Sequence, residues 1–374
     1  MIGIYCHHTT RFHRNTGIQR CLRATARALA EQGEAIVPLV WSQAKNGLAL
    51  ANKASCDHLA CWSGPAAQAW RLQAPPPGSW LLVVELISGP HQPSQPWLQR
   101  LADRCGWRLA AVFHDAIPLG WGGAAAEYHG AYMAGLAQYN LVLATSATTL
   151  ADLASFWRQQ RLTVRARLEA LPLAAEIPGT LRQRPQSPVQ GRLPGNSLRM
   201  LCVGSLEPRK NHRALLQALA WLQAQGELHT STQLVGWAND SSVLAQVQRA
   251  QALGVPLHWD GEATDEALLA HYAACDFTVY PSLQEGFGLP VQESLWLGRP
   301  CLTGPAPALI EQAQGGGCLV VDTRRWQGLA QAIARLQRQP QQLDQLAQQL
   351  LARPLRSWAD YATAMLSIMH STGA

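Results

Sequence analysis

The sequence predicts an α/β protein built from two Rossmann-like domains. Short apolar, strand-like runs alternate with amphipathic helical stretches along the chain, which is the pattern of parallel sheets made from right-handed βαβ units. The 374 residues are too many for one compact core and are typical of two domains. Residues 176–198 are rich in Pro, Gly, Gln and Arg without periodicity, which indicates a linker between the two series.

We therefore expect an N-terminal Rossmann-like domain over residues 1–180 and a linker over 181–197. A second Rossmann-like domain follows over 198–354, and a C-terminal helical segment over 355–374. Hydrophobic residues make up 48% of the chain and charged residues only 14%, as in globular proteins with large cores. The net charge of +6 suits an anionic ligand, a nucleic acid or an acidic membrane surface, and does not choose among them.

Cysteine usage and hydropathy indicate the cellular compartment in which the protein is expected. Nine cysteines are scattered singly, without a CxxC or a zinc-type spacing, which favours a reducing cytoplasm. The chain begins directly with a strand-like run, so no signal peptide is expected. Apolar runs stay well short of the ~20 residues that a membrane-spanning helix needs. The sequence thus predicts a cytoplasmic protein.

The first series of elements contains a loop of interest after its first strand. The strand-like runs are 2–6, 35–41, 80–84, 108–113, 141–145 and 168–173, and the helical stretches are 18–31, 96–105, 124–138 and 149–158. Residues 42–67 form a mostly polar stretch between the second and third strand-like runs. Asn15-Thr16-Gly17 lies between the first strand and the first helix, where open α/β sheets bind phosphate. One glycine without a GxGxxG pattern is a weak indication.

A second candidate group follows the strand 108–113. It ends in Phe113-His-Asp-Ala-Ile-Pro-Leu119, and titratable groups at the carboxyl end of a central strand lie where α/β sheets bind ligands. The alternative is that Asp115 caps the next turn and His114 is a structural loop histidine. The residues alone leave both interpretations open.

The second series carries a basic loop. Its strand-like runs are 198–203, 233–235, 257–259, 277–280, 300–303 and 319–321, and its helical stretches are 212–223, 241–253, 265–274, 306–314, 325–337, 340–351 and, at the C-terminus, 357–369. Arg209 and Lys210 follow a strand and Gly204 at the entrance of a helix, where an arginine fork and a lysine charge suit phosphate oxygens. A solvated basic pair is the alternative, although cations oppose the helix dipole there.

The most informative stretch runs from Tyr280 to Glu293. It has the form of a strand end, a glycine-bearing loop and a helix start, with Pro290 in the first helical turn, the helical position that suits proline. The free N–H groups of such a helix start favour an anion or an oxygen-rich ligand. Glu285 and Glu293 have seven residues between them and can face one cleft from different heights. Preference of acids for a helix N-terminus is the alternative explanation.

Three of these motifs resemble one known family. Glu285-Gly-Phe-Gly-Leu-Pro-Val-Gln-Glu293 resembles the signature of the retaining glycosyltransferases of family 4, which have the GT-B fold. Gly204 to Asn211 resembles the family's Gly-x-x-x-x-x-Lys-Asn element, and His114 to Leu119 resembles a motif of its mannosyl- and rhamnosyl-type members. The resemblance implies two facing domains with a cleft between them and a C-terminal helix that crosses back to the first domain.

The resemblance also implies a role for each site residue. Arg209 and Lys210, with the Gly204 loop, would hold the diphosphate, and Glu293 would bind the ribose. Glu285 would bind sugar hydroxyls, helped by the N–H groups of Gly286, Phe287, Gly288 and Leu289. His114 would lie by the transferred sugar, and Gly236, Trp237 and Ala263–Thr264 would flank the base. Gly17 would approach the phosphates from the first domain, with Asn15 as an alternative contact because many relatives carry Gly-Gly there.

The expected reaction is the retaining, metal-independent transfer of a hexose from a nucleotide sugar, without a further cofactor. GDP-mannose is the preferred donor, and the acceptor would be a glycan or lipid-linked glycan in bacterial polysaccharide, O-antigen or lipopolysaccharide synthesis. UDP- or dTDP-sugars, and a non-catalytic binding scaffold, remain alternatives. Nucleic acid is not an expected partner. The fourteen tryptophans and the basic first loop fit peripheral contact with the inner membrane, and equally fit ordinary core and surface positions.

Overall fold

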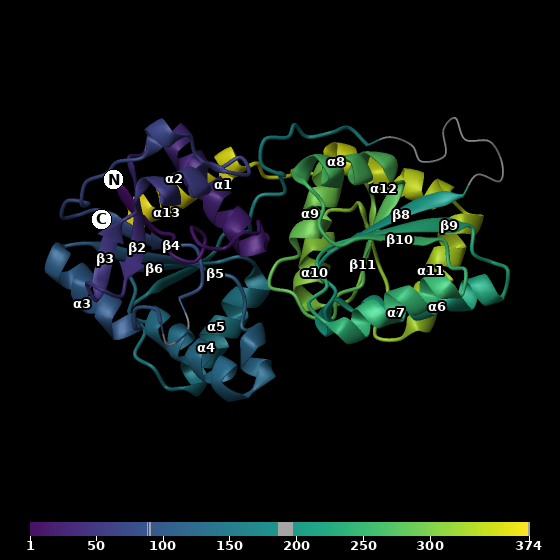
Figure 1. Cartoon of the computed structure of the whole chain (residues 1–374), viewed down its shortest axis with the longest axis horizontal. Coiled ribbons are helices and arrows are strands. Elements are labelled where there is room, and N and C mark those ends of the chain that lie inside the picture. Colours follow the sequence, from purple (N-terminus) through teal and green to yellow (C-terminus); the bar gives the residue numbers. More distant parts are fainter. Residues whose placement is uncertain (88, 90, 186–196, 373–374) are drawn as a thin grey trace. The chain divides into compact units, whose positions relative to one another are not determined.

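The computed structural model describes residues 1–87, 89, 91–185 and 197–372 (Figure 1). The chain divides into two compact units. Unit 1 contains Met1–Ala174 and Arg356–Ala374, and unit 2 contains Ala175–Leu355. Residues 186–196, which make up most of the predicted linker 181–197, lie outside the described residues.

Unit 1 is built on a seven-stranded sheet with the order β3-β2-β1-β4-β5-β6-β7. The strands are β1 (Ile2–Tyr5), β2 (Ile36–Ser42), β3 (Gly47–Leu50), β4 (Trp80–Val83), β5 (Arg108–Phe113), β6 (Leu141–Ala144) and β7 (Arg167–Ala170). Neighbouring strands are parallel except β3, which runs antiparallel to β2. The central strands β1, β4 and β6 are buried along their whole length, as continuous apolar runs predict for a sheet covered on both faces.

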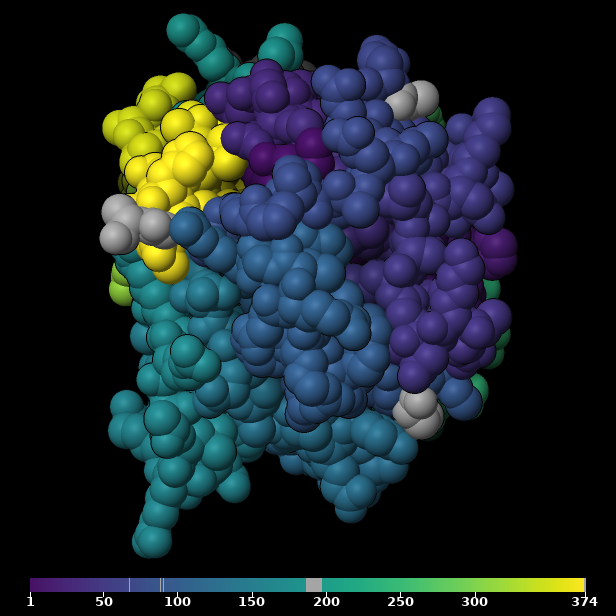
Figure 2. Space-filling view, turned by 90° about the vertical axis from the view of Figure 1, so that its left-hand side faces the viewer, coloured from purple at the N-terminus to yellow at the C-terminus, as the bar shows by residue number. Residues whose placement is uncertain are grey.

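The helices of unit 1 include the C-terminal helix of the chain. They are α1 (Gly17–Glu31), α2 (Lys53–Ala60), α3 (Gln95–Cys105), α4 (Gly123–Leu136), α5 (Ala147–Gln159) and α13 (Trp358–Thr372), with the short helices η1 (Ala67–Ala69) and η2 (Ile117–Trp121). Helix α13 packs against α1, and Figure 2 shows this yellow segment beside the purple N-terminal residues. Arg167 Nη1 donates to Ser371 Oγ at 2.8 Å. The predicted return of the C-terminal helix to the first domain is therefore confirmed.

Unit 2 contains a six-stranded, all-parallel sheet with the order β10-β9-β8-β11-β12-β13. Its strands are β8 (Leu198–Val203), β9 (Thr230–Val235), β10 (Leu257–Asp260), β11 (Phe277–Tyr280), β12 (Cys301–Thr303) and β13 (Cys318–Val320). Its helices are η3 (Pro208–Lys210), α6 (His212–Ala224), α7 (Ser241–Ala252), α8 (Asp265–Ala274), α9 (Leu289–Trp296), α10 (Pro307–Ala313), α11 (Trp326–Arg338) and α12 (Gln341–Ala352). The predicted class, α/β with two Rossmann-like sheets, is confirmed.

Residues 42–67, the polar stretch to which no element was assigned from the sequence, contain regular structure. This segment forms the edge strand β3 and the helix α2. Strand β3 has four residues and no apolar alternation, and it forms because β2 offers a free edge. Helix α2 begins at a cap, Asn52, whose side chain accepts the N–H of Ser55 at 2.9 Å. An asparagine before a helical stretch is a recognisable cap, but the helix is too short for its periodicity to stand out.

Candidate active site

The loops after β8 and β11 lie together at the carboxyl edge of the unit 2 sheet. These two strands are neighbours at the centre of the sheet, so their following loops leave it side by side. The Leu283 N–H donates to the carbonyl of Arg209 at 2.8 Å, and Asn211 Nδ2 donates to the carbonyl of Pro281 at 3.3 Å. Motifs about 75 residues apart in the sequence are thereby brought into one site, as the carboxyl-edge rule for α/β sheets predicts.

Lys210 and Glu285 form a largely buried ion pair at the centre of this site. The Lys210 Nζ lies 2.6 Å from Glu285 Oε1, and Lys210 is only 9% exposed. A lysine buried to this extent needs a compensating charge, because removing a cation from water is costly. Burial by itself would raise the pKa of Glu285. The positive charges of Lys210 and Arg209 outweigh it and hold that pKa below its usual value, so the side chain is a carboxylate.

Arg209 is the more accessible of the two cations. Its side chain is 28% exposed and forms an ion pair with Glu207 at 2.8 Å and a longer one with Glu285 Oε2 at 3.4 Å. Arg209 Nη1 also donates to the carbonyl of Gln284 at 3.3 Å. A planar guanidinium at a partly open position can bind two oxygens of a phosphate at once, whereas Lys210 contributes a fixed buried charge.

The loop after Glu285 leads directly into helix α9, as predicted. Gly288 precedes the helix with φ +96°, a conformation that favours glycine, and Pro290 lies in the first turn. Glu293 lies inside α9 and is 2% exposed, and the Tyr272 hydroxyl donates to its Oε2 at 3.4 Å. The two acids therefore have different surroundings. Glu285 contacts cations, whereas Glu293 is buried in the helix beside a tyrosine.

Gly204 and Gly236 contact each other beside Lys210. Both have positive φ, +158° and +146°. A Cβ added at Gly204 would lie 3.9 Å from the Lys210 Cδ, and one added at Gly236 would lie 2.2 Å from the Gly204 carbonyl oxygen. Thr264, predicted with Gly236 to flank the base, caps α8 by accepting a hydrogen bond from the Ala267 N–H at 3.2 Å. The sequence patterns at these positions thus mark tight backbone turns at the carboxyl edge of the sheet.

A Gly236→Ala variant is expected to lose about 3 kcal/mol or more of unfolding free energy, because its methyl group would overlap the Gly204 carbonyl. The matched control is Gly254→Ala, where φ is +77° but no atom lies within 4 Å of the added carbon. The control should cost only the backbone strain, about 1 to 2 kcal/mol. Urea unfolding of both variants measures the difference, and equal losses would contradict the close approach at Gly236.

Sequence reasoning missed two further contributors to this site, Tyr280 and Ser282. The hydroxyl of Tyr280 donates to Glu285 Oε1 at 2.8 Å, and that of Ser282 donates to the same oxygen at 2.6 Å. Both lie within the stretch Tyr280 to Glu293, five and three residues before Glu285. A buried hydroxyl close to an acid in sequence is the only indication that the sequence offered, and it does not specify a contact.

His212, the first residue of α6, follows the basic pair and is 1% exposed. Both of its ring nitrogens lack a hydrogen-bond partner among the described residues. Burial, and then the charge of Lys210, lower its pKa to about 4. Between pH 6.5 and 4 the unfolded chain therefore binds more protons at this residue than the folded chain does. The stability that depends on a neutral His212 is complete above pH 6.5 and is lost as the pH falls toward 4.

We expect His212 to make the protein sensitive to acid. When the pH is lowered from 6.5 to 4, the unfolding free energy of the wild type should fall by about 3 kcal/mol more than that of a His212→Leu variant. The reason is that one pKa unit corresponds to about 1.4 kcal/mol. Urea titrations at several pH values measure both curves. Curves that stay parallel over this pH range would show that His212 is not held neutral by folding.

In unit 1, His114 directly follows β5, at the carboxyl edge of that sheet. Its Nε2 lies 2.7 Å from the carbonyl oxygen of Val84, which follows β4. A carbonyl only accepts, so Nε2 carries the proton and Nδ1 is left as an acceptor. Burial lowers the pKa of His114, which keeps the imidazole neutral at pH 7. Asp115 caps the next turn by accepting the Ile117 N–H at 3.0 Å, as the alternative interpretation of that residue proposed.

The first loop of unit 1 places Asn15 and Gly17 differently. Gly17 is the exposed first residue of α1. The Asn15 Oδ1 accepts from Arg23 Nη1 at 2.9 Å, so this side chain is committed at least in part to an internal contact. Arg23 itself is almost fully buried, and its guanidinium stacks over the Trp62 ring with the Cζ 4.5 Å from the centroid.

A buried acid holds the same loop and was not predicted. Glu85 accepts the backbone N–H groups of His8 at 2.7 Å and Thr9 at 2.8 Å, and the Thr9 hydroxyl at 2.6 Å. Burial raises its pKa to about 7, while the bonds to Thr9 and His8 act in the opposite direction. The indication in the sequence was a single acid directly after the strong apolar run 80–84.

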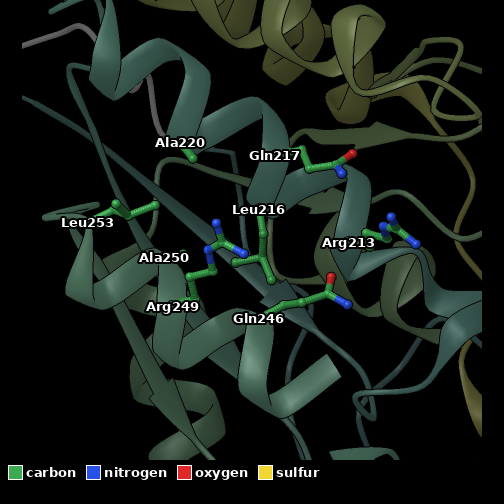
Figure 3. A pocket seen from close by; sticks show the side chains of 8 residues that line it. All are labelled: Arg213, Leu216, Gln217, Ala220, Gln246, Arg249, Ala250 and Leu253. Atoms are coloured by element: carbon green, nitrogen blue, oxygen red, sulfur yellow. The ribbon is translucent and has the colours of Figure 1, made fainter. Parts of the chain in front are cut away.

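A surface hollow of about 490 Å³ lies elsewhere on unit 2, between α6 and α7 (Figure 3). Its lining consists of Arg213, Leu216, Gln217, Ala220, Gln246, Arg249, Ala250 and Leu253. It includes none of the residues predicted to form the site. The candidate site is therefore defined by the charged groups that converge at the carboxyl edge of the sheet, and not by this hollow.

Two Rossmann-like units in one chain are the architecture of the GT-B fold, which solved structures of glycosyltransferases share. Residues 183–350, a little under half of the chain, match the family model described as "Glycosyl transferases group 1". This region contains Arg209, Lys210, Glu285 and Glu293. The predicted resemblance to a GT-B glycosyltransferase is thereby supported at the level of that broad group.

The curated relatives that match part of the chain are named mannosyltransferases. The chain is 38% identical over 124 residues to O-antigen chain mannosyltransferase B of Escherichia coli, which is 33% of this chain and 32% of the relative. It is 32% identical over 115 residues to the serotype-specific mannosyltransferase WbdA of Escherichia coli, which is 30% of this chain and 14% of the relative. The match therefore spans about a third of the length of the first relative and about a seventh of the length of the second. Family and relatives together support a transferase enzyme.

Solved structures match the whole chain. Anabaena Alr3699/HepE in complex with UDP and glucose is 15% identical with a TM-score of 0.69, covering 99% of both chains. Sucrose-phosphate synthase (tll1590) from Thermosynechococcus elongatus is 17% identical with a TM-score of 0.68, covering 99% of this chain and 98% of that one. At these identities the likeness shows the fold alone. Across the described parts of the chain, no helix is both long and apolar enough to cross a membrane.

Proposed function

We propose that the protein is a retaining, metal-independent glycosyltransferase of family 4 that moves a hexose from a nucleotide sugar to a glycan or lipid-linked glycan. The observation that carries the proposal is the buried Lys210–Glu285 pair, with Arg209 more exposed beside it, at the carboxyl edge of the unit 2 sheet. Retention of configuration and independence of metal follow from the resemblance of the Glu285–Glu293 stretch to that family.

The arrangement suits departure of a nucleoside diphosphate. Positive charge fixed before the reaction stabilises the negative charge that develops on the leaving group, and Arg209 and Lys210 supply two such charges. Helix α9 begins at Leu289, four residues after Glu285, and the backbone N–H groups of Gly286 to Leu289 are assigned to the sugar. The Glu285 carboxylate can accept a sugar hydroxyl and so orient the donor. Glu293, inside the same helix, is assigned to the ribose hydroxyls.

The remaining assignments concern the other donor contacts. Gly236, Trp237 and Thr264 would flank the base, and Trp237 is 38% exposed. In unit 1, His114 would present its Nδ1 acceptor to the transferred sugar, because Nε2 is engaged by Val84. Gly17 would approach the phosphates, and Asn15 has its amide nitrogen to offer since its oxygen accepts from Arg23.

Mannose is the preferred sugar and GDP-mannose the preferred donor. The curated relatives are named mannosyltransferases, and His114 to Leu119 resembles the motif of mannosyl- and rhamnosyl-type members. A UDP-sugar is the second candidate, since solved structures with this fold are titled as complexes with UDP and with UDP-glucose. The name of the first relative favours an O-antigen or related surface polysaccharide as the product. The scattered cysteines and the basic, tryptophan-containing first unit are the grounds for placing the reaction in the cytoplasm, at the inner membrane face.

A panel of nucleotide sugars tests the proposal. Each donor is incubated with the purified full chain, and both thermal stabilisation and slow release of the nucleoside diphosphate are measured. GDP-mannose is expected to give the largest stabilisation and the fastest release, and a UDP- or dTDP-sugar in first place would change the donor but keep the reaction. Stabilisation without release from any donor would instead identify a non-catalytic scaffold. If no donor produced either stabilisation or release, the donor site itself would be refuted.

A further inference from the structure

The hydroxyl of Tyr280 lies between the two charged groups of the site. Tyr280 is the last residue of β11 and is 3% exposed. Its Oη lies within hydrogen-bond distance of both Lys210 Nζ and Glu285 Oε1, the latter at 2.8 Å. An ammonium group only donates and a carboxylate only accepts, so Tyr280 accepts from Lys210 and donates to Glu285. Both hydrogen-bonding roles of the phenol are therefore used within the site.

The two oxygens of Glu285 are consequently unequal. Oε1 receives three donors, namely Lys210 Nζ at 2.6 Å, the Tyr280 hydroxyl at 2.8 Å and the Ser282 hydroxyl at 2.6 Å. Within the described residues, the contact found for Oε2 is the ion pair with Arg209 Nη1 at 3.4 Å, longer than a normal hydrogen bond. Since an oxygen of a carboxylate has about two lone-pair sites, Oε1 is saturated and Oε2 retains acceptor capacity.

On the premise of the function proposed above, we propose that Tyr280 is a positioning residue. Its hydroxyl, together with Lys210, fixes Oε1 so that Glu285 presents Oε2 to a hydroxyl of the donor sugar. A carboxylate held by three donors on one oxygen has its rotation about the last side-chain bond restricted, which orients the second oxygen before substrate arrives. Arg209 is the group that contacts Oε2 in this structure, and a bound diphosphate would offer its guanidinium a stronger, bidentate partner.

Tyr280 is separable from the packing of the site, which makes the proposal testable. Its ring lies under the Lys210 ammonium, with the Nζ 5.0 Å from the ring centroid. Phenylalanine keeps that ring and its packing and removes only the hydroxyl. Tyr280→Phe therefore leaves the ion pair in place and releases one of the three donors on Oε1. A purely structural role predicts a change in stability, whereas a positioning role predicts a change in turnover.

The experiment measures donor turnover in Tyr280→Phe with the donor that the wild type uses. We expect kcat to fall about tenfold, with KM for the donor and Kd for the free nucleoside diphosphate changing less than about threefold. The acid limb of the kcat/KM profile should move to higher pH, because a carboxylate that loses a hydrogen-bond donor is protonated more easily. The control is Tyr139→Phe in unit 1, whose buried hydroxyl donates to Gln95 Oε1 at the same distance of 2.8 Å.

The outcomes separate this inference from the proposed function. The positioning role would be overturned, and the function left intact, if the wild type turned over donor and Tyr280→Phe had the same kcat and the same pH profile. A loss of kcat no greater than in Tyr139→Phe, at an equal loss of thermal stability, would also overturn it. Failure of the wild type to release nucleoside diphosphate from any donor would remove the proposed function itself.

Discussion

A Lys210→Met variant is expected to lose transfer activity by a factor on the order of 10² to 10³, the range found when one group that stabilises developing charge is removed from an active site. Methionine preserves much of the length and volume of lysine but not its charge. The buried ammonium 2.6 Å from Glu285 would be lost, and the leaving diphosphate would have one cation fewer. The measurement is the rate of nucleoside diphosphate release at saturating donor.

The same substitution should destabilise the fold. Removing one partner of a buried ion pair leaves the other charge uncompensated, at a cost of about 3 to 5 kcal/mol. The matched control is Lys53→Met, because Lys53 is 88% exposed and forms its 2.8 Å ion pair with Asp57 on the surface of α2. We expect that control to retain full activity and to unfold at nearly the same urea concentration as the wild type, because an exposed ion pair is screened by water. Similar behaviour of the two variants would mean that the Lys210 pair has no special role.

A Glu285→Gln variant is expected to lose transfer by a comparable factor of about 10² to 10³ while it still binds the free nucleoside diphosphate. Glutamine keeps the shape of the side chain but replaces one acceptor oxygen with a donor, so it cannot serve both the internal donors and a sugar hydroxyl. Arg209 and Lys210, assigned to the diphosphate, remain. Calorimetric titration with the diphosphate and a transfer assay measure the two effects separately.

The control for this prediction is the second acid. Glu293, 2% exposed inside α9, is assigned to the ribose, so Glu293→Gln should weaken nucleoside diphosphate binding as well as transfer. If Glu285→Gln instead abolished nucleotide binding and Glu293→Gln spared it, the roles of the two acids would be reversed. Loss of thermal stability alone, without a change in either assay, would contradict both assignments.

The fold and the outline of the site follow from local patterns in the sequence. The strand 277–280, the glycine-bearing loop and the helix with Pro290 in its first turn occur as predicted. A buried apolar run, Gly288 with its positive φ and a first-turn proline all act within a few residues. The meeting of Lys210 with Glu285 also follows, since parallel strands bring their carboxyl ends to one edge.

Contacts that depend on side-chain geometry did not follow from the sequence. The position of Tyr280 between Lys210 and Glu285 depends on how the end of β11 faces the β8–α6 loop, which no periodicity encodes. Glu85 binds the backbone N–H groups of His8 and Thr9, which lie 77 and 76 positions before it in the sequence. Every residue type except proline has such an N–H group, so the sequence does not indicate this contact. Strand β3 forms because β2 has an edge to offer, which is a property of the assembled sheet.

The most direct test of the account compares nucleoside diphosphate release from GDP-mannose and from a panel of UDP- and dTDP-sugars by the wild type and by Glu285→Gln. We predict that the wild type releases the diphosphate from at least one donor, and that Glu285→Gln lowers this rate about 100-fold or more while binding the product diphosphate normally. Equal rates for the two proteins, or no release from any donor by the wild type, would contradict it.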